Sequence, residues 1–582
     1  MKYGVIFTYL KKHWFIYTLG IIMLALVDYY NLIIPQITGQ ITDGLSAKTL
    51  DYNGVLSLII SFFIMVVVVA IGRIIYRFCI FGSCRKVETE IRDDLFAKLE
   101  TLSPNYFNSN KTGDLMSNFT NDIEALRNAM GPAIVSSFDA IVMSLMTLYK
   151  MISYVSLKLT LVTLIPMVLI AIGSLYFAQE EEKRYFEKQR AFGKLSDFVQ
   201  ESYMGIRVIK AFVQEKKQDK EFEKANKNAY TANVAVSKLM AFFWPFLELV
   251  IGISYVMTIV YGGYLTIVGD ITLGRFVAFC QYTNMLIWPM LAFGDAINCF
   301  SQGLAASKRI KTIFDEESEI KDDERTNYSI KELKGSIDFN NLTFKYRKNL
   351  PNALNNISFH IKQGETIAIL GKTGSGKSTI ANLLCRLYNV NDNEICIDGY
   401  NLNTIPLEVL RKAIAYVPQD NYLFSDTITN NVRFGNLEAD LNQVQHVCKM
   451  AMVHDNIIDF PDGYNTLVGE RGVTLSGGQK QRISIARALI KDSSILILDD
   501  SLSAVDTDTE ENILDNLKTY YNNKTIIMIA HRVSTIKNAD YILVLDKGEM
   551  VEFGNFEELM ALNGVFKAMY DKQQLEKQLA LH

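Results

Sequence analysis

The chain has 582 residues, a length that favours two to four domains over one. Hydrophobic residues make up 49% of it and charged residues 21%, and the mean hydropathy is slightly positive, so we expect one part in lipid and another in water. The net charge of −4 argues against nucleic-acid binding, which needs a clustered basic surface. The seven cysteines contain no C-x-x-C pair, and we interpret them as ordinary thiols rather than as metal ligands or disulfides.

The first half of the chain carries apolar stretches long enough to cross a bilayer, which takes roughly 20 helical residues. We place six of them near residues 13–36, 55–80, 131–154, 158–178, 241–266 and 275–300. Short and long connections alternate, and the long ones, at 83–130 and 180–240, are rich in Lys and Arg. The positive-inside rule therefore predicts that these loops, the N-terminus and the C-terminal half are cytoplasmic. A large soluble hydrophobic core is disfavoured, because soluble helices rarely stay apolar for so long.

The composition changes after Lys308. Residues 314–326 are acidic and poor in apolar side chains, which is typical of a solvated linker. The sequence thus predicts a transmembrane domain at 1–307, a linker at 308–332 and a second domain at 333–582. In that second domain, helical patterns separate strand-like runs at 366–370, 395–397, 414–417, 495–498, 525–529 and 541–545. This alternation is the signature of an α/β domain with a largely parallel sheet.

The segment GKTGSGKS, residues 371–378, follows the apolar run TIAIL and opens a predicted helix at Thr379. This is the P-loop pattern in the context that makes it credible. Its backbone N–H groups are expected to wrap phosphates, with help from the helix N-terminus. Lys377 should reach the β- and γ-phosphates, and the Ser378 hydroxyl should bind Mg²⁺. The predicted ATP-binding residues here are Gly371, Thr373, Gly374, Ser375, Gly376, Lys377, Ser378 and Thr379.

A second motif, LSGGQ at residues 475–479, resembles the signature sequence of ABC ATPases. The resemblance to ABC exporters of the type IV fold extends over the whole chain. It implies an all-α six-helix transmembrane domain followed by an α/β P-loop ABC ATPase domain that uses ATP and Mg²⁺. A soluble ABC ATPase, a secondary transporter or an importer would lack this fusion of membrane and ATPase domains.

By that resemblance, further residues acquire roles in the nucleotide site. The aromatic that stacks on adenine is Tyr346, which precedes the P-loop by 25 residues. The Walker B strand ends at Asp499, a Mg²⁺ ligand, and Gln419 is the Q-loop residue near Mg²⁺. The remaining assignments are the signature residues Ser476, Gly477, Gly478 and Gln479, the D-loop at 503–506, the switch histidine His531, and Glu470 in an exporter-type X-loop.

Two stretches resemble the intracellular loops through which type IV exporters transmit ATPase closure to the membrane helices. They lie at 92–122 and 201–212. We place the short helices that press on the nucleotide domains near 117–122 and 205–212.

One position departs from the family pattern. ABC ATPases usually have Glu after the Walker B Asp, as the general base or water-orienting group, and this chain has Asp500. The Asp carboxylate falls short by roughly 1.5 Å, and a 1 Å misplacement can cost about 10²-fold in rate. Loss of general-base help costs typically about 10²–10⁴-fold. The sequence predicts a Walker site that binds ATP and hydrolyses it poorly.

ABC sites form between two chains, one giving the Walker motifs and the other the signature. Since the signature of this chain is intact, it resembles the degenerate subunit of a bacterial heterodimeric exporter. We expect a partner half-transporter that supplies the catalytic Glu. The alternative is a homodimer in which Asp500 serves as a slow base.

The transported substrate is weakly encoded. Four acids fall in or near predicted spans, where an ionisable group is costly and suggests function: Asp28, Asp139, Glu248 and Asp295. Such acids would suit lipophilic cations, so we predict multidrug efflux across the plasma membrane, with lipid or peptide export as alternatives. The alternative is a structural role, in which each acid lies at the end of a span or forms a hydrogen bond between helices. The aromatic residues 242–246 line a drug cavity or form an interfacial belt.

Overall fold

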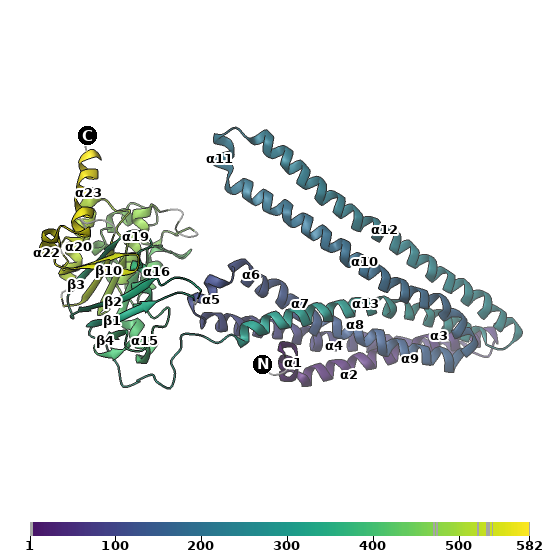
Figure 1. Cartoon of the computed structure of the whole chain (residues 1–582). Helices are drawn as coiled ribbons and strands as arrows, with labels where there is room; N and C mark the ends of the chain where they lie inside the picture. The colour runs from purple at the N-terminus through teal and green to yellow at the C-terminus, as the bar shows by residue number, and fades with distance from the viewer. Residues whose placement is uncertain are drawn as a thin grey trace. The chain divides into compact units, whose positions relative to one another are not determined.

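The computed structural model describes residues 4–347, 349–469, 472, 475–520, 523–530, 536, 537 and 539–580 (Figure 1). The chain forms two compact units. The helical unit comprises Met1–Glu100 and Thr112–Glu316, and the α/β unit comprises Thr101–Lys111 and Glu317–His582. The predicted fold class, membrane helices followed by a P-loop α/β domain, is confirmed.

Helices make up the whole helical unit. Its elements are α1 (Val5–Lys12), α2 (Trp14–Asn31), α3 (Ile34–Ser46), α4 (Tyr52–Glu100), α6 (Thr112–Ser117), η1 (Asn118–Asp122), α7 (Ile123–Met130), α8 (Pro132–Phe138), η2 (Asp139–Met143), α9 (Ser144–Lys150), η3 (Met151–Val155), α10 (Leu157–Met204), α11 (Ile206–Ala211), α12 (Glu215–Val268) and α13 (Leu273–Asp315). In the described chain, five helical stretches are long and apolar enough to cross a membrane: Trp14–Ser46, Tyr52–Glu100, Thr112–Val155, Glu215–Val268 and Leu273–Asp315. The shorter apolar start of α10, Leu157–Leu169, corresponds to the remaining predicted span.

The long helices extend far beyond their apolar parts. The helices α4, α10 and α12 have 49, 48 and 54 residues. At 1.5 Å per residue they are roughly 70–80 Å long, more than twice the hydrocarbon core of about 30 Å. The predicted spans cover only the apolar parts of these helices, because charged residues end a hydropathy signal without ending a helix. Helices α10 and α12 run side by side, and α11, at the predicted position of the second contact helix, connects their ends (Figure 1).

The third span is irregular. It breaks at Gly131, and Pro132 then opens α8, because proline suits the first turn of a helix and cannot continue one. Two π-helical turns follow, η2 and η3. The predicted membrane acid Asp139 is the first residue of η2. Such π-turns are rare and occur often at functional sites.

The α/β unit contains two sheets. The strands are β1 (Ile337–Phe344), β2 (Leu354–Ile361), β3 (Thr366–Gly371), β4 (Ile395–Ile397), β5 (Tyr400–Asn401), β6 (Ile414–Val417), β7 (Ile495–Asp499), β8 (Thr525–Ala530), β9 (Tyr541–Asp546) and β10 (Glu549–Gly554). The larger sheet has the order β10-β9-β3-β8-β7-β6 and is parallel except for β10. The expected parallel sheet is confirmed, with one correction: the predicted strand at 395–397 is β4 of the smaller sheet, antiparallel to β1.

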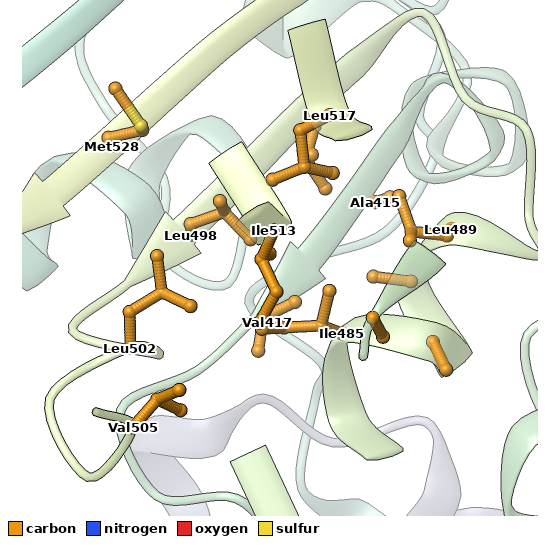
Figure 2. Close-up of a cluster of buried hydrophobic side chains, with 14 of the residues drawn as sticks. Ala415, Val417, Ile485, Leu489, Leu498, Leu502, Val505, Ile513, Leu517 and Met528 are labelled. Carbon is orange, nitrogen blue, oxygen red and sulfur yellow. The ribbon is translucent and has the colours of Figure 1, made fainter. Parts of the chain in front are cut away.

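Most helices described in the α/β unit lie between strands, whereas α5 precedes β1, and α22 and α23 follow β10. The helices are α5 (Pro104–Ser109), α14 (Lys377–Leu384), η4 (Leu402–Thr404), α15 (Leu407–Ala413), α16 (Ile428–Arg433), α17 (Leu441–Met450), α18 (His454–Ile458), η5 (Gly463–Asn465), α19 (Gly477–Leu489), α20 (Thr507–Tyr520), α22 (Phe556–Leu562) and α23 (Val565–Ala580). One hydrophobic core seats α19 and α20 on β6 and β7 (Figure 2). In it, Ile485 and Leu489 of α19 join Val417 of β6 and Leu498 of β7.

The α/β unit includes a piece of the first long loop. Helix α5 belongs to it: Asn108 donates a hydrogen bond to the Tyr388 hydroxyl at 3.0 Å, and Arg347 donates to the Ser109 hydroxyl at 2.9 Å. The sequence placed this contact helix near 117–122, which instead forms the π-helical turn η1 of the helical unit. Pro104 is the first residue of α5, a position that proline favours.

The acidic segment predicted as a solvated linker is anchored along its length. Ile320 in the segment, and Ile330 and Leu333 just after it, are buried, and the backbone carbonyl of Lys321 accepts a hydrogen bond from Arg386. These three buried apolar residues are too widely spaced to give a hydrophobic signal. The segment therefore packs against the α/β unit rather than acting as a free tether.

Two glycines of α13 provide a test of how this helix packs against α7. At Gly303 an added Cβ would overlap the Cβ of Ala129 on α7, whereas at Gly294 it would meet no described heavy atom within 4 Å. We expect Gly303→Ala to destabilise the helical unit by about 1–3 kcal/mol through overpacking. Gly294→Ala should be neutral or stabilise by up to about 1 kcal/mol through helix propensity. Thermal unfolding of the purified chain in detergent measures both, and equal melting temperatures would contradict the α7–α13 contact.

Candidate functional site

The phosphate loop lies between β3 and α14. Gly374 and Gly376 have φ angles of +81° and +98°, which only glycine adopts readily. A Cβ at Gly376 would also lie 2.6 Å from the carbonyl oxygen of Ala353. The loop is therefore shaped by its glycines, as in loops whose backbone N–H groups bind phosphate. Ser375 and Thr379 are buried in the same loop and helix.

Lys377 is folded back onto this loop. Its ammonium donates hydrogen bonds to the carbonyl oxygens of Gly371 at 2.8 Å and of Lys372 at 2.9 Å. Burial lowers the pKa of Lys377, and the charges of Asp499 and Asp500 partly oppose that effect. A polyphosphate beside the ammonium would favour its charged form, so the loop suits an anionic ligand.

Ser378 and Asp499 meet at the end of β7. The Ser378 hydroxyl donates to a carboxylate oxygen of Asp499 at 3.1 Å, and the Tyr416 hydroxyl donates to the other oxygen at 3.4 Å. Burial raises the pKa of Asp499, which is 2% exposed. A divalent cation there would favour the carboxylate. No group of three or more His, Cys, Asp or Glu side chains could hold a metal in the described part of the chain, so Mg²⁺ would need phosphate oxygens or water as additional ligands.

The predicted adenine platform lies beside α14. The Tyr346 hydroxyl is 3.0 Å from that of Thr379, and the Tyr346 ring packs edge-on against Tyr388 and Phe344. These contacts hold the ring at the edge of the loop. Gln419 follows β6 and is exposed, so its side chain can reach a ligand or a neighbouring chain.

The signature residues form the start of α19. Ser476 is the N-cap, and it makes a reciprocal capping box with Gln479: the Ser476 hydroxyl accepts from the Gln479 backbone N–H at 3.2 Å, and the Gln479 side chain accepts from the Ser476 N–H at 2.9 Å. A Cβ at Gly478 would lie 2.8 Å from the carbonyl oxygen of Ala504, whereas one at Gly477 would make only ordinary contact. The glycine at 478 thus allows the D-loop backbone to approach α19 closely.

Asp500 is held by its main chain. It has a left-handed conformation, with φ of +48°, and its N–H donates to the Ile529 carbonyl at 2.8 Å. Its carbonyl accepts from the Ser503 hydroxyl at 3.0 Å and from the Gln481 amide at 3.4 Å. Gln481 also accepts from the Ala504 N–H at 2.9 Å, so one buried side chain connects α19, the D-loop and Asp500.

Sequence reasoning missed Gln481 and Arg487. Arg487 of α19 donates to the backbone of Tyr422 and of Asn431, both at 2.8 Å, and lies over the Phe424 ring. It connects the segment after Gln419 to the signature helix. The only signal in the sequence was that these two residues follow the signature motif at helical spacing. The predicted His531 and Glu470 lie outside the described residues.

The four membrane acids divide into two kinds. Asp28 on α2 is only 5% exposed, and Asp139 in η2 is half-buried with one carboxylate oxygen fully buried. Glu248 on α12 and Asp295 on α13 are exposed. Of the aromatic cluster, Phe242, Phe243 and Phe246 pack against Phe177 of α10 with ring centroids 4.7–6.1 Å apart, and Trp244 is exposed.

Known protein families match the membrane part and the nucleotide-binding part of the chain separately. A family model described as the ABC transporter transmembrane region matches residues 17–290, and one described as ABC transporter matches residues 354–503. The chain is 38% identical over 568 residues to the probable multidrug resistance ABC transporter ATP-binding/permease protein YheI of Bacillus subtilis (strain 168), covering 97% of each chain. It is 36% identical over 571 residues to the multidrug resistance-like ATP-binding protein MdlA of Escherichia coli (strain K12), covering 98% of this chain and 96% of the relative.

A solved structure of a bacterial Atm1-family ABC exporter with ATP bound superposes with a TM-score of 0.78 at 25% sequence identity, covering 97% of this chain and 98% of that one. The similarity includes the membrane helices as well as the nucleotide motifs. This protein therefore belongs to the ABC transporter family, as an exporter half-transporter in which a membrane domain is fused to an ATP-hydrolysing domain.

Proposed function

We propose that this chain is one half of a heterodimeric exporter of lipophilic, mainly cationic, compounds, and that its own Walker site hydrolyses ATP poorly. The observation that carries the proposal is the fixed main chain at Asp500. In this account ATP lies along the glycine loop with its adenine on Tyr346. Lys377 faces the terminal phosphates, and Ser378, Gln419 and Asp499 hold Mg²⁺.

The carboxylate of Asp500 cannot reach the position that a Glu carboxylate would occupy. A Glu carboxylate would extend roughly 1.5 Å further, about one C–C bond. Moving the Asp carboxylate forward by a main-chain shift would break the hydrogen bond to Ile529 and those from Ser503 and Gln481. Asp also tolerates the left-handed conformation better than most residues, so the substitution fits the backbone while weakening the base.

The signature of the same chain is fully formed. The N-terminus of α19 is capped by Ser476, and Gly477 and Gly478 keep its first turn free of side chains. Backbone N–H groups at such a helix start stabilise phosphate charge. We therefore expect this signature to complete the active Walker site of a partner chain that carries the catalytic Glu.

The partner chain also needs a contact surface, and the end of the α10–α12 hairpin supplies one. Val208, Phe212 and Val213 are 62%, 71% and 78% exposed around α11. Apolar side chains rarely cluster in solvent without a partner. We propose that this end docks on the ATPase domain of the partner on the cytoplasmic side, as the family resemblance implies.

The substrate class follows from charge within the membrane domain. Glu248 and Asp295 are exposed on membrane-spanning helices, where an uncompensated carboxylate is costly and a bound organic cation would offset that cost. The relatives named above carry the words multidrug resistance in their names, which supports efflux of lipophilic compounds. Buried Asp28 is a poor contact for a large molecule.

The first test compares two residues of this chain that serve different sites. Gly478→Asp should reduce steady-state ATPase by at least about 10²–10³-fold, because its side chain would meet the Ala504 carbonyl of the D-loop and would add negative charge to the helix start that is expected to face phosphate. Asp500→Asn should change the rate far less, because its site already contributes little. The matched control is Asp492→Asn, which removes a carboxylate from another left-handed residue outside the site. If Asp500→Asn proves as damaging as Gly478→Asp in the co-purified complex, the two sites are equivalent and the heterodimer proposal fails.

The second test concerns the exposed membrane acids. The double variant Glu248→Gln, Asp295→Asn should lower transport of the cationic dye ethidium by several-fold and leave transport of the neutral dye Nile red unchanged, because only the cation loses an ion pair. Asp270→Asn, in the connection between α12 and α13, is the control for loss of an acid outside the spans. Dye efflux from inverted vesicles measures both substrates. An equal loss for both dyes, or for neither, would remove charge recognition at these residues, and preferential loss of lipid transport would favour a lipid exporter.

A further inference from the structure

The membrane domain contains two carboxylates, the buried Asp28 and the half-buried Asp139, that the proposed transport cycle does not use. Asp28 lies on α2, and Asp139 opens the π-turn η2. One carboxylate oxygen of each, Oδ2 of Asp28 and Oδ1 of Asp139, is fully buried and lacks a hydrogen-bond partner among the described residues. A buried polar atom without a partner costs free energy, so each such oxygen indicates a missing hydrogen or ligand.

The charges around the pair do not balance. The charge of Asp139 acts on Asp28, and the guanidinium of Arg73 on α4 acts on both. Among the described residues neither carboxylate forms an ion pair within 4.0 Å, the guanidinium of Arg73 included. Asp295 of α13, the helix that packs against η2, interacts with Glu181 instead. Two ionised carboxylates beside one arginine would leave one negative charge uncompensated.

The residues next to the two acids belong to an apolar cluster. Val27, which precedes Asp28, and Phe138, which precedes Asp139, lie in one hydrophobic cluster with the buried Leu24 and Val69. An unpaired ion in such an environment costs several kcal/mol even after relaxation. One further positive charge is therefore required at the pair.

We propose that Asp28 and Asp139 together bind one proton within the membrane domain, with Arg73 compensating the remaining carboxylate. A large cation is excluded because Asp28 is only 5% exposed. A metal ion would need several oxygen ligands, and the described residues offer no cluster of three or more acidic or other metal-ligating side chains there. A proton needs only one carboxylate oxygen and satisfies it directly.

The site connects proton binding to helix movement. The two acids lie on different helices, and the π-turn at Asp139 is a place where a helix can readjust. A movement that separates α2 from η2 would admit water and let the carboxylic acid release its proton as RCOOH → RCOO⁻ + H⁺. The proton is thus taken up or released with conformational change, independently of the substrate contacts at Glu248 and Asp295.

Infrared spectroscopy of the full complex in lipid nanodiscs tests the proposal without substrate or ATP turnover. At neutral pH the wild-type protein should show the C=O stretch of a protonated carboxylic acid, shifted in D₂O. Asp28→Asn and Asp139→Asn should each remove this band, because the remaining carboxylate then pairs with Arg73. Glu248→Gln, which removes an exposed acid of the same domain, should leave it unchanged.

Arg73→Gln provides an independent outcome if the Asn variants fold poorly. Without the guanidinium both carboxylates need a proton, so the band should grow about twofold. A wild-type spectrum without the band, a band that survives in both Asn variants, or one unchanged in Arg73→Gln would overturn the proposal. The measurement requires neither drug transport nor ATP hydrolysis. The proton site can therefore be confirmed when the proposed function is contradicted, and it can be contradicted when the proposed function is confirmed.

Discussion

The side chain of Gln481 holds together the parts of the ATPase domain on which function depends. Its amide group accepts from the backbone of Ala504 and donates to the hydroxyl of Ser503 and the carbonyl of Asp500. Through it the signature helix α19, the D-loop and the residue after the Walker B strand form one rigid assembly. A hydrophobic core beneath them, with Leu502 and Val505 in the same cluster as Ile485, fixes this assembly on the sheet (Figure 2).

This connection has a consequence for an exporter with two unequal sites. In ABC transporters the signature of one chain faces the Walker motifs of the other, so Asp500 and Ser476 belong to different sites. Because Gln481 of the signature helix bonds to Asp500 and the D-loop, in the proposed heterodimer a nucleotide held at the weak site would position the signature that serves the strong one. The proposed weak site would then support catalysis at its neighbour.

Local motifs made the strands and helices of the candidate nucleotide site predictable. The P-loop, the strand ending at Asp499 and the capped start of α19 depend on short runs of sequence, and the structure has a strand or helix at each. The sequence did not predict that Asp28 is buried and Glu248 exposed, since both are single acids in apolar runs. The difference in their exposure comes from packing, in the case of Asp28 from that of α2 against α4. The place of α5 in the α/β unit was missed for the same reason: Asn108 and Tyr388 are 280 residues apart. The Gln481 contacts likewise depend on how the D-loop folds back onto α19.

The central claim is that ATP remains intact at the Walker site of this chain while its partner turns over. The direct measurement is photolabelling of the heterodimer with azido-ATP carrying radiolabel on either the α- or the γ-phosphate, followed by separation of the two chains after steady-state turnover. We predict that this chain keeps both labels, whereas the partner keeps the α-label and loses the γ-label. Loss of the γ-label from both chains at the same rate would contradict the account.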